Sequence, residues 1–157
     1  MTHDKRTLAV HAGTRRSQYS EMSEAIFMTQ GFVYDTAQSA EVRFEQAGDD
    51  EFIYARYGNP TVRMFEERIA SLEGAEDGFA AASGMAAVHG ALAALLRAGD
   101  HIVAARALFG SCLYVLEEVL IHFGVNVTFI DGLDLAAWKG AITSDTKLVF
   151  FESISNP

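Results

Sequence analysis

The sequence is poor in residues that stabilise secreted proteins and in those that bind nucleic acids. Cys112 is the single cysteine among 157 residues, so no disulfide forms within the chain and an oxidising compartment is not indicated. Lysine and arginine together number 12 against 21 aspartates and glutamates, a net charge of −9. This excess of acidic residues disfavours nucleic acids and anionic membrane surfaces as partners.

Apolar runs that would export or anchor the chain are also scarce. No apolar stretch follows residues 1–7, so a secretory signal is not expected. The most apolar segment, 79–96, contains Ser83, His89 and two glycines, and alanine supplies much of its apolar character. That composition favours a short strand and a buried helix over a membrane span. The whole composition, 50% hydrophobic and 21% charged, predicts a globular protein with the cytoplasm as its expected compartment.

Helices and strands are predicted to alternate after Asn59. Residues 1–53 lack a steady helical period, with a brief extended piece expected at 30–34 and one or two helical turns at 40–47. Asn59-Pro60 predicts a helix start, and Gly74 a helix end. Further on, helices are expected at 61–72, 84–97, 111–123 and 134–142, and strands at 77–82, 100–105, 126–131 and 146–152. Such alternation predicts an α/β fold with a mostly parallel sheet covered on both faces.

The last predicted strand suggests that the fold continues beyond it. Pro157 follows a strand of central, apolar character, and no helix comes after it to cover the sheet. We therefore expect the chain to be part of a larger protein.

Ser83-Gly84-Met85 forms a candidate anion site. The triplet lies where a strand gives way to a helix, and ligands of open α/β sheets gather at the carboxyl ends of the strands. Unpaired amides at a helix start favour a phosphate. Small residues also occur at such turns only to let the chain bend. Because no Gly-x-Gly-x-x-Gly stands at this turn, and no Gly-x-x-x-x-Gly-Lys-Ser/Thr occurs anywhere, dinucleotide and P-loop sites are disfavoured.

Three other segments carry candidate ligand residues. Tyr54 and Arg56 could bind a phosphate by hydrogen bond and charge, or form a plain surface turn. Phe109 follows a strand and could stack on a flat ring or pack in the core. The five histidines show no metal-ligand spacing, and Cys112, in the first turn of a helix, is expected to be a buried structural residue.

These motifs together resemble the pyridoxal-phosphate enzymes of cysteine and methionine metabolism. The resemblance rests on Tyr54–Pro60, on Ala82–Met85 and on Glu152–Pro157, and it extends over essentially the whole chain. The segments 15–18, 29–35 and 104–112 are similar to the O-succinylhomoserine sulfhydrylase branch. The fold so implied is an N-terminal arm (1–58) followed by an incomplete large domain (59–157) of the aminotransferase-like, three-layer α/β/α type.

The resemblance implies a set of contacts to pyridoxal 5'-phosphate. Ser83, Gly84 and Met85 would bind its phosphate, Tyr54 and Arg56 would reach the same group from a neighbouring subunit, and Phe109 would stack on its ring. Many family members have tyrosine in place of Phe109, so a phenolic hydroxyl is missing here. From the motif Glu152–Pro157, Asn156 would hydrogen-bond the ring hydroxyl and Glu152 would lie at the pocket floor. Ile154 stands where the family has proline, which loosens this turn.

The lysine that binds the cofactor covalently has no counterpart among Lys5, Lys139 and Lys147. Ser144–Lys147 matches the family's Ser-x-Thr-Lys pattern, but it precedes the last strand, whereas the family's lysine follows that strand by a long interval. The acid that would pair with the pyridine nitrogen is also missing. This chain alone is therefore expected to have no activity.

The implied reaction of the whole protein is γ-replacement, in which sulfide displaces succinate from an O-acylhomoserine to give homocysteine. A homo-oligomer, a dimer of dimers, is the expected assembly. Cystathionine γ-synthase and γ-lyase activities share every residue named above and stay open. A non-catalytic remnant or assembly partner is a second alternative, and a plain nucleotide-binding domain is a third.

Overall fold

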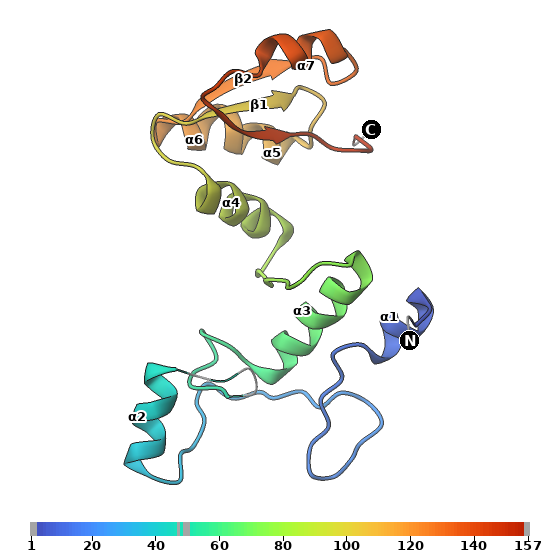
Figure 1. Cartoon of the computed structure of the whole chain (residues 1–157), viewed down its shortest axis with the longest axis vertical. Coiled ribbons are helices and arrows are strands. Elements are labelled where there is room, and N and C mark those ends of the chain that lie inside the picture. The colour runs from blue at the N-terminus through green and yellow to red at the C-terminus, as the bar shows by residue number, and fades with distance from the viewer. Residues whose placement is uncertain (1–2, 47, 49–50, 156–157) are drawn as a thin grey trace. The chain divides into compact units, whose positions relative to one another are not determined.

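The computed structural model describes residues 3–46, 48 and 51–155. The chain divides into two compact units, Met1–Ala80 and Ala81–Pro157, and each is described by itself (Figure 1). Asn156, one of the predicted ligand residues, lies outside the described residues.

Helix α3 (Pro60–Glu73) is the longest element of the first unit, and its sequence defines both ends. The Asn59 side chain accepts a hydrogen bond from the amide of Thr61 at 2.8 Å, and Pro60 occupies the first turn, where its missing N–H costs nothing. Gly74 ends the helix in the left-handed region at φ 70°, which glycine adopts without strain. The helix predicted at 61–72 is confirmed.

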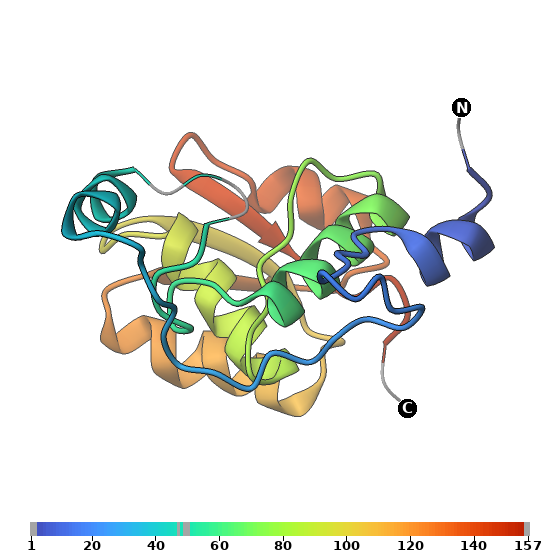
Figure 2. The ribbon, with the colours of Figure 1, turned by 90° about the horizontal axis from the view of Figure 1, so that it is seen from below.

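The N-terminal segment is fastened to α3 by polar contacts. Arg68 donates from Nε to the carbonyl of Ala12 at 2.9 Å and pairs with Glu24. Asn59 donates from Nδ2 to the carbonyl of Phe27 at 2.9 Å. Helix α1 (Lys5–His11) packs beside α3 (Figure 2). The apolar period did not predict α1 because a seven-residue helix with no buried residue has no apolar stripe.

Helix α2 (Ala37–Glu45) begins three residues before the turns predicted at 40–47. The Thr36 hydroxyl accepts from the amide of Ser39 at 3.0 Å, and the Ser39 hydroxyl accepts from the amide of Thr36 at 3.1 Å. This reciprocal capping box fixes the helix start. The extended piece predicted at 30–34 is reduced to one antiparallel bridge between Gly31 and Tyr54.

The second unit is built on a parallel sheet. Strand β1 (His101–Ala105) lies between β2 (Asn126–Ile130) and β3 (Thr146–Phe150), and it pairs in parallel with both. Helix α7 (Leu135–Ala141) covers one face, and the helical run of α5 (Gly110–Tyr114), η1 (Val115–Val119) and α6 (Leu120–His122) covers the other (Figure 1). The predicted α/β class and the parallel sheet are confirmed.

The core of this unit lies between the sheet and the helices on one face. Helix α4 (Gly84–Leu95) joins the helical run in covering Ile102 and Ala104 of β1. Buried members of this core are Leu92, Leu96, Ile102, Ala104, Val115, Leu116, Leu120 and Val125. The turn η1 is π-helical, a local widening that the apolar period of 111–123 does not reveal.

The strand predicted at 77–82 is wrong. These residues are irregular, and Phe79 is 92% exposed. A strand needs a neighbour to pair with, and the sheet formed by the described residues contains β1, β2 and β3 alone. The segment is held by side chains of α3 instead, since the Glu66 carboxylate accepts from the amide of Ala80 at 2.8 Å.

The described part of the chain contains no helix long and apolar enough to span a bilayer. The apolar segment 79–96 divides into an irregular stretch and α4.

Replacing a buried leucine of the second unit tests the position of the core. Leu116 is completely buried, so Leu116→Ala leaves a cavity and should lower the free energy of unfolding by about 2–5 kcal/mol. Leu95→Ala makes the same chemical change at a side chain that is 65% exposed, and should cost less than about 0.5 kcal/mol. Urea denaturation of both variants measures the difference, and equal losses would contradict this core.

Candidate functional site

The carboxyl ends of the three parallel strands meet at one edge of the second unit. Ala105, Ile130 and Phe150 end β1, β2 and β3, and the loops that follow carry Phe109 and Glu152. The edge where such strands end is where open α/β sheets bind ligands.

The start of α4 has the features of an anion site. The Ser83 hydroxyl accepts from the amide of Ala86 at 3.1 Å and so defines the first turn. The amides of Gly84 and Met85 precede the first intrahelical bond and stay available to an anion. A Cβ added at Gly84 would meet no atom within 4 Å, so the surroundings of this residue are open. The donors and the helix dipole suit a phosphate group.

Helices α4 and α5 meet at their first turns. The Met85 sulfur lies 3.9 Å from the Cys112 sulfur, which is on the second residue after Gly110 at the start of α5. The predicted residues Ser83, Gly84 and Met85 therefore lie in the same part of the unit as Phe109, which immediately precedes α5.

Phe109 presents its ring partly to solvent, with 44% of the residue exposed. Its backbone amide donates to Oε1 of Glu152 at 2.7 Å. This contact joins the loop after β1 to the residues after β3. The core alternative for Phe109 is not supported, whereas its neighbour Leu108 does pack against the core.

Tyr54 and Arg56 occupy a turn of the first unit, before α3. The Tyr54 carbonyl accepts from the amide of Tyr57 at 2.8 Å, and the amide of Ala55 donates to the carbonyl of Gln30 at 2.8 Å. The Arg56 guanidinium lies 5.4 Å from the ring centre of Tyr54 and 5.2 Å from that of Tyr57. Both predicted residues are exposed, so their phenol and guanidinium can reach a ligand outside this unit.

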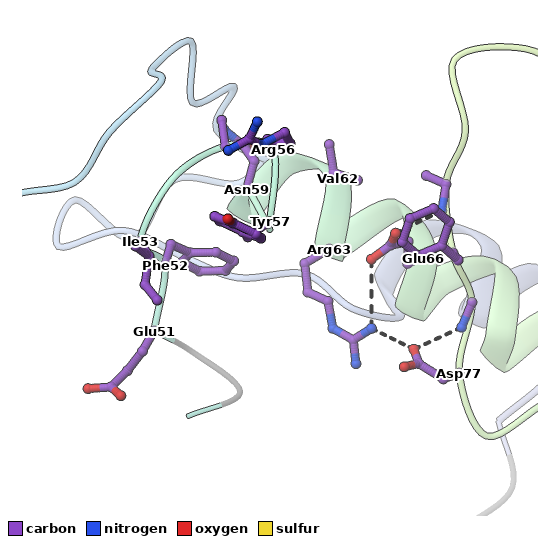
Figure 3. A pocket seen from close by; sticks show the side chains of 15 residues that line it. Glu51, Phe52, Ile53, Arg56, Tyr57, Asn59, Val62, Arg63, Glu66 and Asp77 are labelled. Atoms are coloured by element: carbon purple, nitrogen blue, oxygen red, sulfur yellow. Dashed lines mark hydrogen bonds and ion pairs between the residues drawn. The ribbon is translucent and has the colours of Figure 1, made fainter. Parts of the chain in front are cut away.

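A cavity of about 470 Å³ lies beside this turn, and Arg56 and Tyr57 line it (Figure 3). Arg63 of α3 also lines the cavity, and its guanidinium pairs with the carboxylates of Asp77 at 2.5 Å and Glu66 at 3.7 Å. The hydrogen bond from Arg63 lowers the pKa of Asp77 below its usual value. Arg63 is thus engaged by carboxylates, while Arg56 contacts aromatic rings.

The lysines do not supply a site. Lys147 is the second residue of β3 and is exposed, near the amino end of the strand and away from the ligand edge. Lys5 lies in α1 and Lys139 in the last turn of α7. Among the residues that the structure describes, no three side chains of His, Cys, Asp or Glu gather as a metal ion requires.

Sequence reasoning missed two carboxylate contacts to backbone amides. Glu66 binds the amide of Ala80, and Glu152 binds that of Phe109. Neither contact had a signal in the sequence, because the partners lie 14 and 43 positions apart.

The parallel α/β sheet with a candidate anion site at a helix start is the arrangement expected of a pyridoxal-phosphate family. The family model for Cys/Met metabolism PLP-dependent enzymes matches residues 6–157. The chain belongs to this family.

Individual relatives of the chain belong to enzymes of the same kind. The chain is 52% identical to O-succinylhomoserine sulfhydrylase of Mycobacterium tuberculosis and 40% identical to L-methionine gamma-lyase of Fusobacterium nucleatum, each over 96% of its length. A solved structure from Campylobacter jejuni, assigned as an O-acetylhomoserine (thiol)-lyase, contains N'-pyridoxyl-lysine-5'-monophosphate. It matches 99% of this chain with a TM-score of 0.91 and 32% identity. This chain spans only 37% or 38% of the length of these three proteins.

The reactivity of Cys112 follows from its surroundings. Burial raises the pKa of the thiol above its ordinary value of 9.0, and the nearby Glu152 carboxylate raises it further. A raised pKa in the folded state contributes stability below pH 9, and that contribution is lost as pH rises through the folded-state pKa.

We therefore expect iodoacetamide at pH 8 to alkylate Cys112 at least about tenfold faster in urea than in the native protein, because the thiolate is the reactive form. Mass spectrometry over time measures both rates. Equal rates would show that the thiol is neither buried nor shifted.

Proposed function

We propose that this chain is the N-terminal portion of a pyridoxal-phosphate enzyme that replaces the acyl group of an O-acylhomoserine with sulfide to give homocysteine. The observation that carries the proposal is the 52% identity to an O-succinylhomoserine sulfhydrylase, against 40% to a methionine gamma-lyase over the same share of the chain. The replacement of tyrosine by Phe109 also agrees with the sulfhydrylase branch. The activity belongs to the whole protein, of which residues 1–58 would be the arm and 59–157 part of the large domain.

The start of α4 would bind the cofactor phosphate. The amides of Gly84 and Met85 would donate to phosphate oxygens, and the Ser83 hydroxyl would hold the turn in place. The space around Gly84, where a side chain would stand, is open. This combination of donors and space supports the assignment.

Tyr54 and Arg56 would complete the phosphate site from a neighbouring subunit. The phenol would donate a hydrogen bond and the guanidinium would add charge, a pairing that suits a phosphate dianion. The exposure of both side chains supports a role outside their own unit. An assembly of at least two subunits follows from this arrangement, and a dimer of dimers is proposed.

Phe109 and Asn156 would orient the cofactor ring. The exposed phenyl ring would stack on the pyridine, and the Asn156 amide would donate to the ring hydroxyl. When bound, the cofactor draws electrons from the bonds of the substrate's α-carbon. The covalent lysine and the acid at the pyridine nitrogen would come from the rest of the protein, in the cytoplasm.

The reaction is tested with the polypeptide as its own cell makes it. Incubation with O-succinylhomoserine and sulfide should yield homocysteine, measured by mass spectrometry. Cystathionine from added cysteine would instead indicate a γ-synthase, and 2-oxobutyrate without an acceptor would indicate a γ-lyase. Sulfide-dependent homocysteine formation at a rate below both of the others would contradict the proposal.

The intact mass of the natural polypeptide distinguishes a non-catalytic assembly partner from the enzyme. A natural product well above 17.1 kDa has room for the missing lysine, whereas one of 17.1 kDa that co-purifies with a longer relative would be an assembly partner. Binding of a nucleotide without binding of pyridoxal phosphate would favour a nucleotide-binding domain.

Variants of the turn before α3 test the phosphate contacts. Loss of a charged hydrogen bond costs about 1.5–3 kcal/mol, so Arg56→Ala should weaken pyridoxal-phosphate affinity by about 10-fold to 100-fold. Tyr54→Phe should weaken it by about tenfold. Tyr57→Phe is the matched control, since Tyr57 also contacts Arg56 but has no proposed ligand. Fluorescence titration measures the three affinities, and an effect of Tyr57→Phe equal to that of Tyr54→Phe would refute the assignment.

Mixed oligomers test whether the contact crosses subunits. Arg56→Ala and Gly84→Asp each damage every site in a homodimer. In a heterodimer of the two variants, one site combines the intact α4 start with the intact Arg56 of its neighbour. Random mixing should therefore restore about a quarter of the cofactor sites if Arg56 acts across the interface. No restoration would place Arg56 and Gly84 in the same subunit's site.

A further inference from the structure

The helical run that starts with α5 lacks a cap of its own. Five other helices of the described residues begin with a side chain that accepts an amide hydrogen bond, and these caps are Asp4, Thr36, Asn59, Ser83 and Asp134. The residue at the corresponding place before α5 is Phe109, which makes no such bond. A phenyl ring has no acceptor for the amides of the first turn, and the amide of Phe109 itself has its acceptor in another segment.

Glu152 supplies that acceptor from outside the helix. Its Oε1 lies 2.7 Å from the backbone nitrogen of Phe109. A carboxylate gives a stronger bond than a neutral acceptor, and its charge is favourable at a helix N-terminus. Glu152 follows β3 by two residues, and Phe109 belongs to the loop after β1. The bond therefore fastens together the loops of two neighbouring strands at the ligand edge.

The backbone on both sides of Phe109 is also fixed. Leu108 packs against the core, and Gly110 begins α5. With the amide of Phe109 held by Glu152, the direction in which the phenyl ring leaves the backbone is set, while 44% of the residue stays exposed. The nearby Cys112 thiol lies in the first turn of the helix, and its pKa is raised by burial and further by the Glu152 carboxylate.

We propose that Glu152 is a positioning residue, which holds the amide of Phe109 so that its ring is presented to the flat ring of the cofactor. This role rests on the proposed function, because the proposed function supplies pyridoxal phosphate as the ligand that Phe109 would contact. The contact itself is a property of the chain and can be measured without cofactor or turnover.

The first test is hydrogen exchange on the cofactor-free natural polypeptide. Glu152→Ala removes the acceptor, so exchange of the peptide that contains Phe109 should accelerate by at least about tenfold. Glu152→Gln retains a side-chain oxygen that can accept the same bond, and should stay within about threefold of the wild type. Glu118→Gln removes an exposed carboxylate from the same helical run and should change nothing. Unchanged exchange in Glu152→Ala would overturn the proposal.

Alkylation of the Cys112 thiol distinguishes the effect of the Glu152 charge from that of its hydrogen bond. In Glu152→Gln the pH midpoint for alkylation of Cys112 should fall, because the carboxylate that raises it is gone, and Glu118→Gln should leave it unchanged. A midpoint that Glu152→Gln does not move would show that Glu152 is not held beside α5, against the proposal. This variant keeps the size and hydrogen-bonding shape of the side chain, so it tests the contact even if Glu152→Ala does not fold.

The orientation of the ring is tested with pyridoxal phosphate itself. Glu152→Ala and Phe109→Ala should each reduce the visible circular dichroism of the bound cofactor by about half or more, whereas Glu152→Gln should preserve it. Faster exchange with an unchanged cofactor spectrum would make the bond purely structural and overturn the positioning role. Failure of the wild type to bind the cofactor would refute the proposed function, and exchange and alkylation would still decide the contact between Glu152 and Phe109.

Discussion

The burial of strand β1 is the constraint on which the second unit depends. Ile102 to Ala105 are all buried, so both faces of the strand must be covered and both of its edges must be paired. Parallel pairing with β2 and β3 satisfies both edges of the strand, and helices cover both of its faces. Parallel order in turn brings the carboxyl ends of all three strands to one edge, and the loops at that edge carry the candidate residues Phe109 and Glu152.

Two helix starts supply candidate ligand groups at that edge. At α4, Ser83 caps its own helix, and the amides of Gly84 and Met85 stay available beside open space. At α5, Phe109 has no side-chain acceptor for the first turn, and its own amide donates to Glu152, which follows the neighbouring strand β3. One start is therefore suited to an anion, and the other holds a carboxylate and presents a ring.

The first unit uses charge where the second uses apolar packing. Arg63 and Arg68 of α3 pair with carboxylates and carbonyls of the segments before and after the helix, and thereby hold irregular chain against it. These partly exposed ion pairs fix the position of the neighbouring segments more than they raise the free energy of unfolding, since exposed ion pairs are individually weak. The turn with Tyr54 and Arg56 lies outside these ion pairs, with both side chains exposed and the Arg56 guanidinium over the rings of Tyr54 and Tyr57.

The sequence by itself determined the elements with strong local signals. Asn59-Pro60 and Gly74 bound α3, the apolar runs gave β1 and β3, and the motifs at Tyr54, Ser83 and Glu152 gave the family. The tertiary structure decided what depends on distant partners. Residues 77–82 have strand character, but the described residues offer them no neighbouring strand, and the amide of Ala80 donates to Glu66 of α3 instead. The contact of Glu152 with Phe109 joins residues 43 positions apart, which no local pattern can specify, because it exists only once β1 and β3 pair.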